Sequence, residues 1–320
     1  IGSASRFSLS LGEGDADRAA QAVGNALAMM VLFGILYTLC IEIFLVPLLN
    51  AFGATQDVLP YAIEYTRITA VGMPLLIITN GMSNLARADG SPNYSMMCML
   101  IGAIINTILD PLFIFKFHMG VRGAAFATVI GQFFSFLMAL YYVKKFTHIR
   151  LKKQHFILKP QVCLNIASLG MSNCLNQVAI TFVQIVMNNS MTYYGAKTIY
   201  GSEIPLAASG IVMKTNGILL SVIIGLSQGS QPIIGFNYGA KQYDRVRGIY
   251  RLAISCNLVV SAIGFVLFQF FPKQIIALFG TGDELYFTFA VRFMRIFLFM
   301  VIVNLSLIHI SEPTRPQLIS

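Results

Sequence analysis

Charged residues are scarce in this sequence. Aspartate, glutamate, lysine and arginine together make up 11% of the 320 residues, whereas a soluble globular chain contains about 25%. Hydrophobic residues make up 56%, and the mean hydropathy is +0.72. So few charges cannot cover the water-exposed surface of a folded chain of this length, which excludes a soluble globular protein. The composition therefore predicts an integral membrane protein.

Patterns that would bind a metal or form disulfides are also lacking. Five cysteines are present, but no two of them form a Cys-x-x-Cys pair, and we interpret them as small apolar packing residues. His118, His148 and His155 fall in predicted loops or at predicted helix ends. The spans therefore contain neither the paired acids nor the histidine cluster that a membrane-embedded enzyme would need. We expect no enzymatic activity, no metal site and no organic cofactor.

Long apolar stretches are abundant instead. Eight of them have about the 20 residues that a helix needs to cross a bilayer. They predict spans at about 22–46, 60–86, 93–117, 120–145, 163–191, 203–228, 248–271 and 285–304. Residues 1–11 look like the last turns of a further helix. The sequence therefore predicts an all-α protein that crosses the membrane several times.

The basic residues indicate an orientation. Lysine and arginine number 22 and acidic residues 13. The longest polar connection is 144–160, KKFTHIRLKKQHFILKP, which separates the chain into two halves. If this segment is cytoplasmic and the spans alternate, thirteen loop cations are cytoplasmic and four face outward, namely Lys116, Arg122, Lys197 and Lys273. This bias follows the positive-inside rule, so the expected partner of the basic excess is the lipid bilayer with its anionic headgroups, not nucleic acid.

The two halves share an internal repeat. The stretches 45–68 and 270–296 both contain a proline, a Phe-Gly pair, an acidic residue and Arg-Ile, in that order. The matched residues lie 225–228 positions apart: Gly14 and Gly239, Pro47 and Pro272, Gly53 and Gly280, and Arg67 and Arg295. An even number of predicted spans separates the copies, so both copies have the same orientation. We expect two helical bundles related by a parallel repeat, which is the plan of a two-lobed transporter.

Four motifs carry a resemblance to a known family. They are LGEGD-x-x-R-A from residue 11, N-x-x-x-DPLFIF from residue 106, G-x-x-GAAxAT from residue 120 and SQGSQPIIGFNYGA at 227–240. Together they resemble the MATE family of multidrug and toxic compound extrusion transporters, over residues 1 to about 304. That family has twelve helices in two bundles of six. The resemblance implies that this chain holds about eight complete spans, from the end of helix two through most of helix ten.

The resemblance also implies a domain organisation. Residues 1–143 would form an N-terminal lobe without helix one and most of helix two, and 144–160 a cytoplasmic basic linker. Residues 161–304 would form a C-terminal lobe without its last helices, so we expect the chain alone not to transport. The stretch 305–315, LSLIHISEPTR, matches the translation of a transposon end used in sequencing libraries. We interpret 305–320 as a sequencing-adaptor artefact.

Asp110 stands inside the apolar run IINTILDPLFIF, 104–115. An ionised aspartate at mid-membrane costs about 2.5–3.5 kcal/mol, so it persists when it pairs, faces water or is protonated. Asn106 lies one turn earlier on the same helix face, and Pro111 removes a backbone donor and frees a carbonyl nearby. The resemblance implies a site for a proton or cation, to which Asn106, Asp110 and Thr128 correspond. A structural aspartate that bridges neighbouring helices is the alternative.

The predicted span 163–191 carries a polar stripe. Its members recur at helical spacing: Asn173, Gln177, Thr181, Gln184 and Asn188. They either line a substrate cavity or form hydrogen bonds between helices, each worth about 0.6 kcal/mol. Lys214, in the predicted span 203–228, either lines the same cavity or extends its charge toward the membrane surface.

The resemblance implies an antiporter, coupled to H⁺ or Na⁺, that exports organic cations and drugs across a bacterial inner (plasma) membrane. A flippase for lipid-linked precursors is the alternative of similar architecture. Such flippases tend to have a strongly cationic cavity, whereas the intramembrane charge here is mainly Asp110. We expect small organic cations or drugs as partners, and no obligate protein partner.

Overall fold

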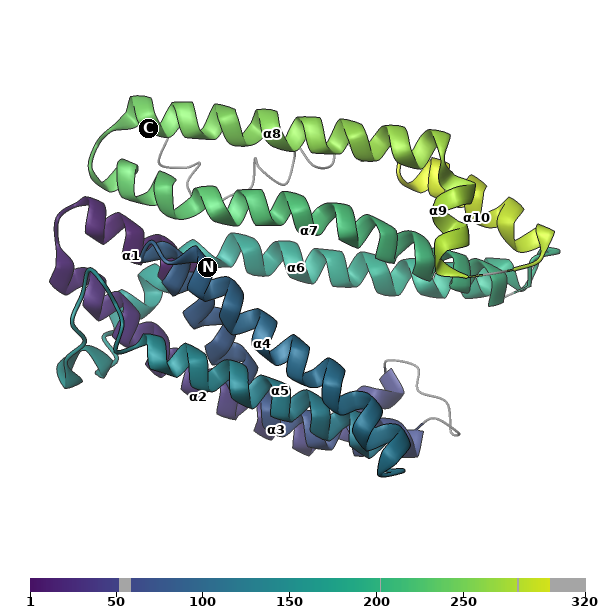
Figure 1. Cartoon of the computed structure of the whole chain (residues 1–320), viewed down its shortest axis with the longest axis horizontal. Coiled ribbons are helices and arrows are strands. Elements are labelled where there is room, and N and C mark those ends of the chain that lie inside the picture. The colour runs from purple at the N-terminus through teal and green to yellow at the C-terminus, as the bar shows by residue number, and fades with distance from the viewer. Residues whose placement is uncertain (52–58, 202, 281, 300–320) are drawn as a thin grey trace. The chain divides into compact units, whose positions relative to one another are not determined.

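The computed structural model describes residues 1–51, 59–201, 203–280 and 282–299. Gly53 and the predicted adaptor segment 305–320 lie outside these residues. Within them the chain forms helices and no strand, which confirms the all-α prediction (Figure 1). The helices are α1 (Gly2–Gly12), α2 (Ala16–Ala51), α3 (Leu59–Ala88), α4 (Pro92–Pro111), α5 (Gly120–Tyr142), α6 (Pro160–Gly195), α7 (Glu203–Gly239), α8 (Tyr243–Phe270), α9 (Pro272–Phe279) and α10 (Glu284–Phe297), with short helical turns at Leu112–Lys116 and Lys153–Phe156.

Seven of the described helices, α2 to α8, are long and apolar enough to cross a membrane. They correspond to the first seven predicted spans. The eighth predicted span, 285–304, is described as far as residue 299, and its helix α10 has 14 residues. Helix α7 continues past the predicted end at 228 to Gly239, because Pro232 removes one backbone donor without stopping the helix. The SQGSQPIIGFNYGA motif is therefore helical almost to its end.

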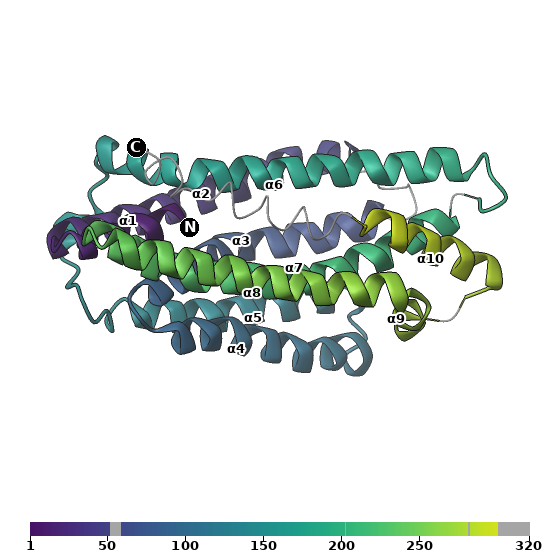
Figure 2. The same cartoon turned by 90° about the horizontal axis from the view of Figure 1, so that it is seen from above.

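The described chain forms two compact units. The first contains Ile1–Leu169 together with Gly235–Lys241, and the second contains Gly170–Ile234 and the chain from Gln242 onward. In the first unit α2, α3, α4 and α5 run beside one another, as both views show (Figures 1 and 2). The core of the first unit includes Phe7, Val23 and Leu85, and that of the second includes Val212 and Met294.

The structure gives the internal repeat a register of 227 residues. Helix α2 begins at Ala16 and α8 begins at Tyr243. The turn before α2 has a left-handed residue, Gly14 with φ 80°, and the turn before α8 has Lys241 with φ 58°. The helical path is broken at Phe44 inside α2, with φ −105°, and again at Phe271 between α8 and α9, with φ −120°. Each of these pairs is 227 positions apart.

Two of the sequence-based matches are therefore out of register by two residues. Gly14 corresponds to Lys241 and not to Gly239, because the equivalence lies in the left-handed backbone and not in the residue type. Pro47 lies inside α2, three residues after the break at Phe44, whereas Pro272 follows its break directly. The repeat itself is confirmed, since the helix starts and the breaks both recur.

The repeated arginines share a role. Arg67 of α3 pairs with Glu42 of α2, with 3.5 Å between Nε and Oε2. Arg295 of α10 donates from Nε to the carbonyl of Gln269 in α8 at 3.1 Å, and the Gln269 amide donates back to the Arg295 carbonyl at 2.9 Å. Gln269 follows Glu42 by 227 residues. Each copy thus ties its arginine helix to the preceding long helix at the same place.

A second symmetric contact lies within the first unit, between α1 and the last turns of α7. A Cβ atom added to Gly12 would collide with the carbonyl oxygen of Phe236, and one added to Gly239 would collide with the carbonyl oxygen of Leu9. Phe236 follows Leu9 by 227 residues and Gly239 follows Gly12 by the same number. The two helices therefore use repeat-equivalent residues on both sides of one reciprocal contact, as in an isologous interface.

This reciprocity generates a prediction. Gly12→Ala and Gly239→Ala should each destabilise the first unit by about 1–3 kcal/mol, because each added methyl overpacks a backbone contact. Gly210→Ala is the matched control, since a Cβ there meets no atom within 4 Å. Thermal unfolding of the purified chain in detergent would measure the effects. Equal melting temperatures for all three variants would contradict the contact.

Candidate cation-coupling site

Two glycines bring α4 and α5 close together. A Cβ added to Gly131 of α5 would lie 2.6 Å from the carbonyl oxygen of Gly102 in α4, and one added to Gly102 would lie 2.8 Å from the carbonyl oxygen of Gly131. Lipid offers no hydrophobic drive for helices to associate, so such close backbone packing is a main source of their contact. The approach is close enough for short polar side chains on the two helices to reach each other.

The predicted site residues meet at this contact. Asn106 lies one turn after Gly102 on α4, and its amide nitrogen is 3.3 Å from Oδ1 of Asp110. The same nitrogen is 3.4 Å from Oγ1 of Thr128 on α5. Thr128 donates its own proton to the carbonyl of Ala124 at 2.9 Å, so its oxygen is left to accept from Asn106. The structure thus places all three residues together, with Asn106 between the other two.

Asp110 sits where regular α-helix ends. Pro111 follows it as the last residue of α4, and the chain continues into the π-helical turn Leu112–Lys116. Proline has no N–H, so the carbonyl of Thr107 loses its helical donor. Single π turns in helices occur often at functional sites. The carboxyl is only partly buried, so it lies within reach of an exchanging ion as well as of Asn106.

Two features of this region were not expected from the sequence. The Oε1 atom of Gln132, one turn after Thr128, is buried and has no hydrogen-bond partner among the described residues. It faces Gly72 of α3. Arg122 at the start of α5 pairs with Glu64 of α3, and both line an open pocket together with Tyr61 and His118. Glu64 and Arg122 are 58 residues apart, so no local spacing indicates this pair.

The polar stripe of the second half has a different setting. Asn173, Gln177, Thr181, Gln184 and Asn188 all lie on α6 with exposed side chains. Thr181 donates to the carbonyl of Gln177 on its own helix at 3.0 Å. Lys214 on α7 is also exposed. The stripe therefore forms one continuous face of α6, and both interpretations, cavity wall and interhelical contact, remain hypotheses.

The fold and the repeat define the chain as a multi-pass membrane protein built from two parallel copies of one helical plan. A protein-family model described as MatE matches residues 1–112 and 166–315, which is well over half of the chain. The chain therefore belongs to the MatE family.

Relatives with assigned names agree with this membership. The chain is 23% identical over 276 residues to "Probable multidrug resistance protein YoeA" of Bacillus subtilis, covering 84% of this chain and 58% of that protein. It is 26% identical over 295 residues to "FAD transporter" of Shewanella oneidensis, covering 86% and 60%. It is 25% identical over 238 residues to "Multidrug export protein MepA" of Staphylococcus aureus (strain MW2), covering 73% and 50%. None of these three is named as an enzyme, and the chain spans at most about 60% of their lengths.

Solved structures share the fold. One described as the outward-facing conformation of a multidrug resistance MATE family transporter matches with a TM-score of 0.86 at 22% identity, covering 99% of this chain and 71% of that one. Another, described as MATE in the straight conformation, matches with a TM-score of 0.84 at 23% identity, covering 99% and 71%. At these identities the likeness shows the fold alone.

The facing of α4 and α5 can be tested by cross-linking. In a background with the five native cysteines replaced by serine, Asn106→Cys with Thr128→Cys should form a disulfide in high yield, because their polar atoms are 3.4 Å apart. Adding Gly131→Ala should lower the yield by separating the helices. Thr107→Cys with Thr128→Cys is the control, since Thr107 is exposed on α4. Equal yields from the two pairs, measured by gel mobility, would contradict the arrangement.

Proposed function

We propose that the complete protein containing this chain is an antiporter of the bacterial inner membrane, which exports organic cations and drugs in exchange for H⁺ or Na⁺. The observation that carries the proposal is the Asn106 amide, which lies between the Asp110 carboxyl and the Thr128 hydroxyl. A carboxyl in this setting can bind and release a cation as access to it alternates between the two sides of the membrane. Two named relatives, a multidrug resistance protein and a multidrug export protein, support an exporter of this class.

The site geometry distinguishes the two coupling ions. A proton can bind to Asp110 without any change in its neighbours. A Na⁺ ion takes oxygen ligands, and Asn106 now presents its N–H₂ group to both oxygens. Binding Na⁺ between Asp110 and Thr128 therefore requires the amide to turn so that its oxygen faces the ion. Proton exchange is the simpler reaction for the arrangement described, and Na⁺ exchange remains the alternative ion of the same proposal.

The flippase alternative has less support in the described residues. The polar cluster of the first unit centres on a carboxyl, which favours a cationic partner over an anionic one. The relative named as an FAD transporter is a reminder that members of one family carry chemically different molecules. We therefore propose the coupling site with more detail than the substrate.

The central test is the substitution Asp110→Asn in the complete transporter. Asparagine keeps the size and the hydrogen bonding of aspartate but cannot bind or release a proton, so coupled efflux should be abolished while expression and melting temperature stay unchanged. The measurement is substrate efflux from proteoliposomes under an imposed H⁺ or Na⁺ gradient. Asn106→Ala and Thr128→Ala should reduce the rate less, because these residues orient the carboxyl and do not carry its charge.

Two controls separate coupling from a general loss of structure. Thr107→Ala removes a hydroxyl on the same turn of α4 that bonds only to its own helix, at the carbonyl of Ala103. Asp244→Asn removes a carboxyl at the exposed start of α8. Both controls should transport at the normal rate. If Asp110→Asn also does so under the gradient, Asp110 is structural and the proposal fails.

A further inference from the structure

The basic segment 144–160 is fixed to the first unit at its beginning. Asp89, in the turn between α3 and α4, has a fully buried side chain. One of its oxygens accepts from the Tyr142 hydroxyl and from the backbone N–H of Thr147, both at 2.8 Å. The other lies 2.9 Å from Nδ1 of His148. These contacts hold the chain as it leaves α5.

The same segment is fixed again near its end, by Asn25 of α2. The buried Asn25 amide donates to the carbonyls of His155 and Ile157 at 3.0 and 3.1 Å, and its oxygen accepts from the backbone N–H of Lys159 at 2.7 Å. Gly24 makes this possible, because a Cβ there would collide with the His155 carbonyl. The segment therefore cannot lie against α2 in this way if residue 24 carries a side chain.

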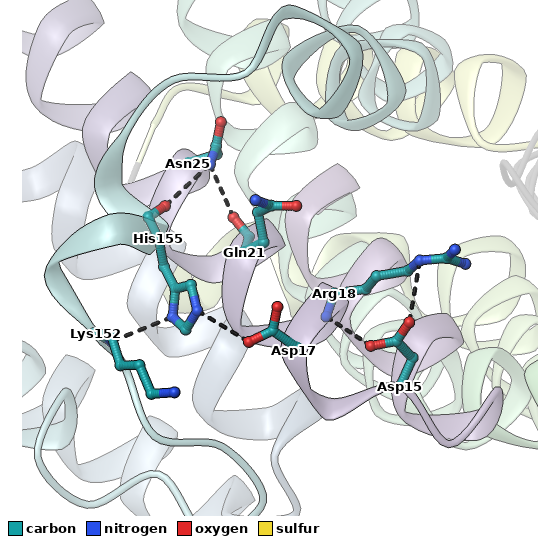
Figure 3. A network of polar contacts seen from close by, with 7 residues as sticks. All are labelled: Asp15, Asp17, Arg18, Gln21, Asn25, Lys152 and His155. Atoms are coloured by element: carbon teal, nitrogen blue, oxygen red, sulfur yellow. Dashed lines mark hydrogen bonds and ion pairs between the residues drawn. The ribbon is translucent and has the colours of Figure 1, made fainter.

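The buried ring of His155 completes this second attachment (Figure 3). Its Nδ1 accepts from the backbone N–H of Lys152 at 3.2 Å. Its Nε2 therefore carries the proton and donates to Asp17 of α2, also at 3.2 Å. Figure 3 shows Asn25 and His155 side by side, with Asp17 one turn earlier on α2. The linker is thus a docked part of the first unit and not a free tether.

The docked segment presents charge that no carboxylate neutralises. Six of its cations are exposed and take part in none of the ion pairs among the described residues: Lys144, Lys145, Arg150, Lys152, Lys153 and Lys159. The nearby acids are already engaged, since Asp89 contacts His148 and Asp17 contacts His155. A rigid surface with six unneutralised cations attracts an anionic partner.

The same segment also presents an apolar ridge. Phe156, Ile157 and Leu158 are consecutive and are 40%, 65% and 44% exposed. Cations flank them on both sides in the sequence, with Lys153 before and Lys159 after. An exposed apolar patch beside basic residues is the pattern of a segment that lies in the membrane–water interface. Free solution does not favour such a ridge, and neither does a nucleic acid backbone.

The position of the segment supplies the partner. It connects α5, which ends at Tyr142, to α6, which begins at Pro160, and both are membrane-length helices. Lys145 lies 5.8 and 5.1 Å from the ring centres of Tyr94 and Tyr141, and tyrosines are enriched at membrane interfaces. We propose that the docked segment 144–160 is a preformed binding surface for anionic phospholipid headgroups, with Phe156, Ile157 and Leu158 inserted at the headgroup boundary.

The proposal goes beyond orientation by charge, because it makes binding depend on the attachment as well as on the cations. It is also independent of the transport proposal, since no step of it involves Asp110. Loss of coupled efflux in a site variant and loss of lipid preference in a linker variant are therefore separate results.

The chain contains no tryptophan, so Phe156→Trp gives a single fluorescent reporter on the ridge. The full chain with this change would be placed in nanodiscs that contain the same mole fraction of either brominated phosphatidylglycerol or brominated phosphatidylcholine. We expect stronger quenching by the brominated phosphatidylglycerol. Each linker cation removed should lower that preference by up to about fivefold.

Matched variants separate three contributions. Lys152→Gln with Lys153→Gln and Lys159→Gln should remove the preference, whereas Arg245→Gln with Arg247→Gln and Arg251→Gln, on α8, removes as many cations and should leave it intact. Gly24→Ala and Asn25→Ala keep every cation but undo the docking, so they should lower the preference as well. Two different undocking variants guard against one that fails to fold.

Equal quenching by the two brominated lipids would overturn the proposal. So would an unquenched tryptophan, which would place the ridge against protein and not lipid. If the α8 triple variant lowers the preference as much as the linker triple variant, the cations act only through their number and the docked surface has no role.

Discussion

The close backbone contact between α4 and α5 is the constraint on which the polar site depends. Asparagine, aspartate and threonine are short, and in a membrane they cannot rely on water to bridge a wide gap. Gly102 and Gly131 let the two backbones meet, so the Asn106 amide can reach Thr128 across the helix boundary. A larger residue at either glycine would separate the helices and leave each polar group to bond within its own helix.

The 227-residue repeat explains several features that look unrelated in the sequence. Broken helical geometry recurs at Phe44 and Phe271, and a tie to the preceding helix recurs at Arg67 and Arg295. The chemistry of the tie differs between the copies, because Gln269 replaces the acid at Glu42. The repeat therefore conserves positions of contact, while the residues that make each contact vary.

The linker shows how a polar segment can be part of a membrane protein's folded structure. Its attachment uses buried hydrogen bonds from Asp89 and Asn25, both of which have most of their bonding capacity filled. Buried polar groups satisfied in this way fix one arrangement, since any displacement would leave them unpaired. The exposed cations and the apolar ridge are consequently presented in one fixed order.

The sequence by itself determined the class of fold, the first seven spans, the existence of a repeat and the grouping of Asn106 with Asp110, because each of these follows from local composition or helical spacing. It also placed Thr128 with them through the family resemblance. The repeat register was wrong by two residues at Gly14 and Pro47, since residue type does not report a left-handed backbone. The pairing of Glu64 with Arg122, the docking of His155 on α2 and the glycine contacts were decided only by tertiary structure. They join residues far apart in the chain, and their energy depends on the distance between helices, which no local pattern contains.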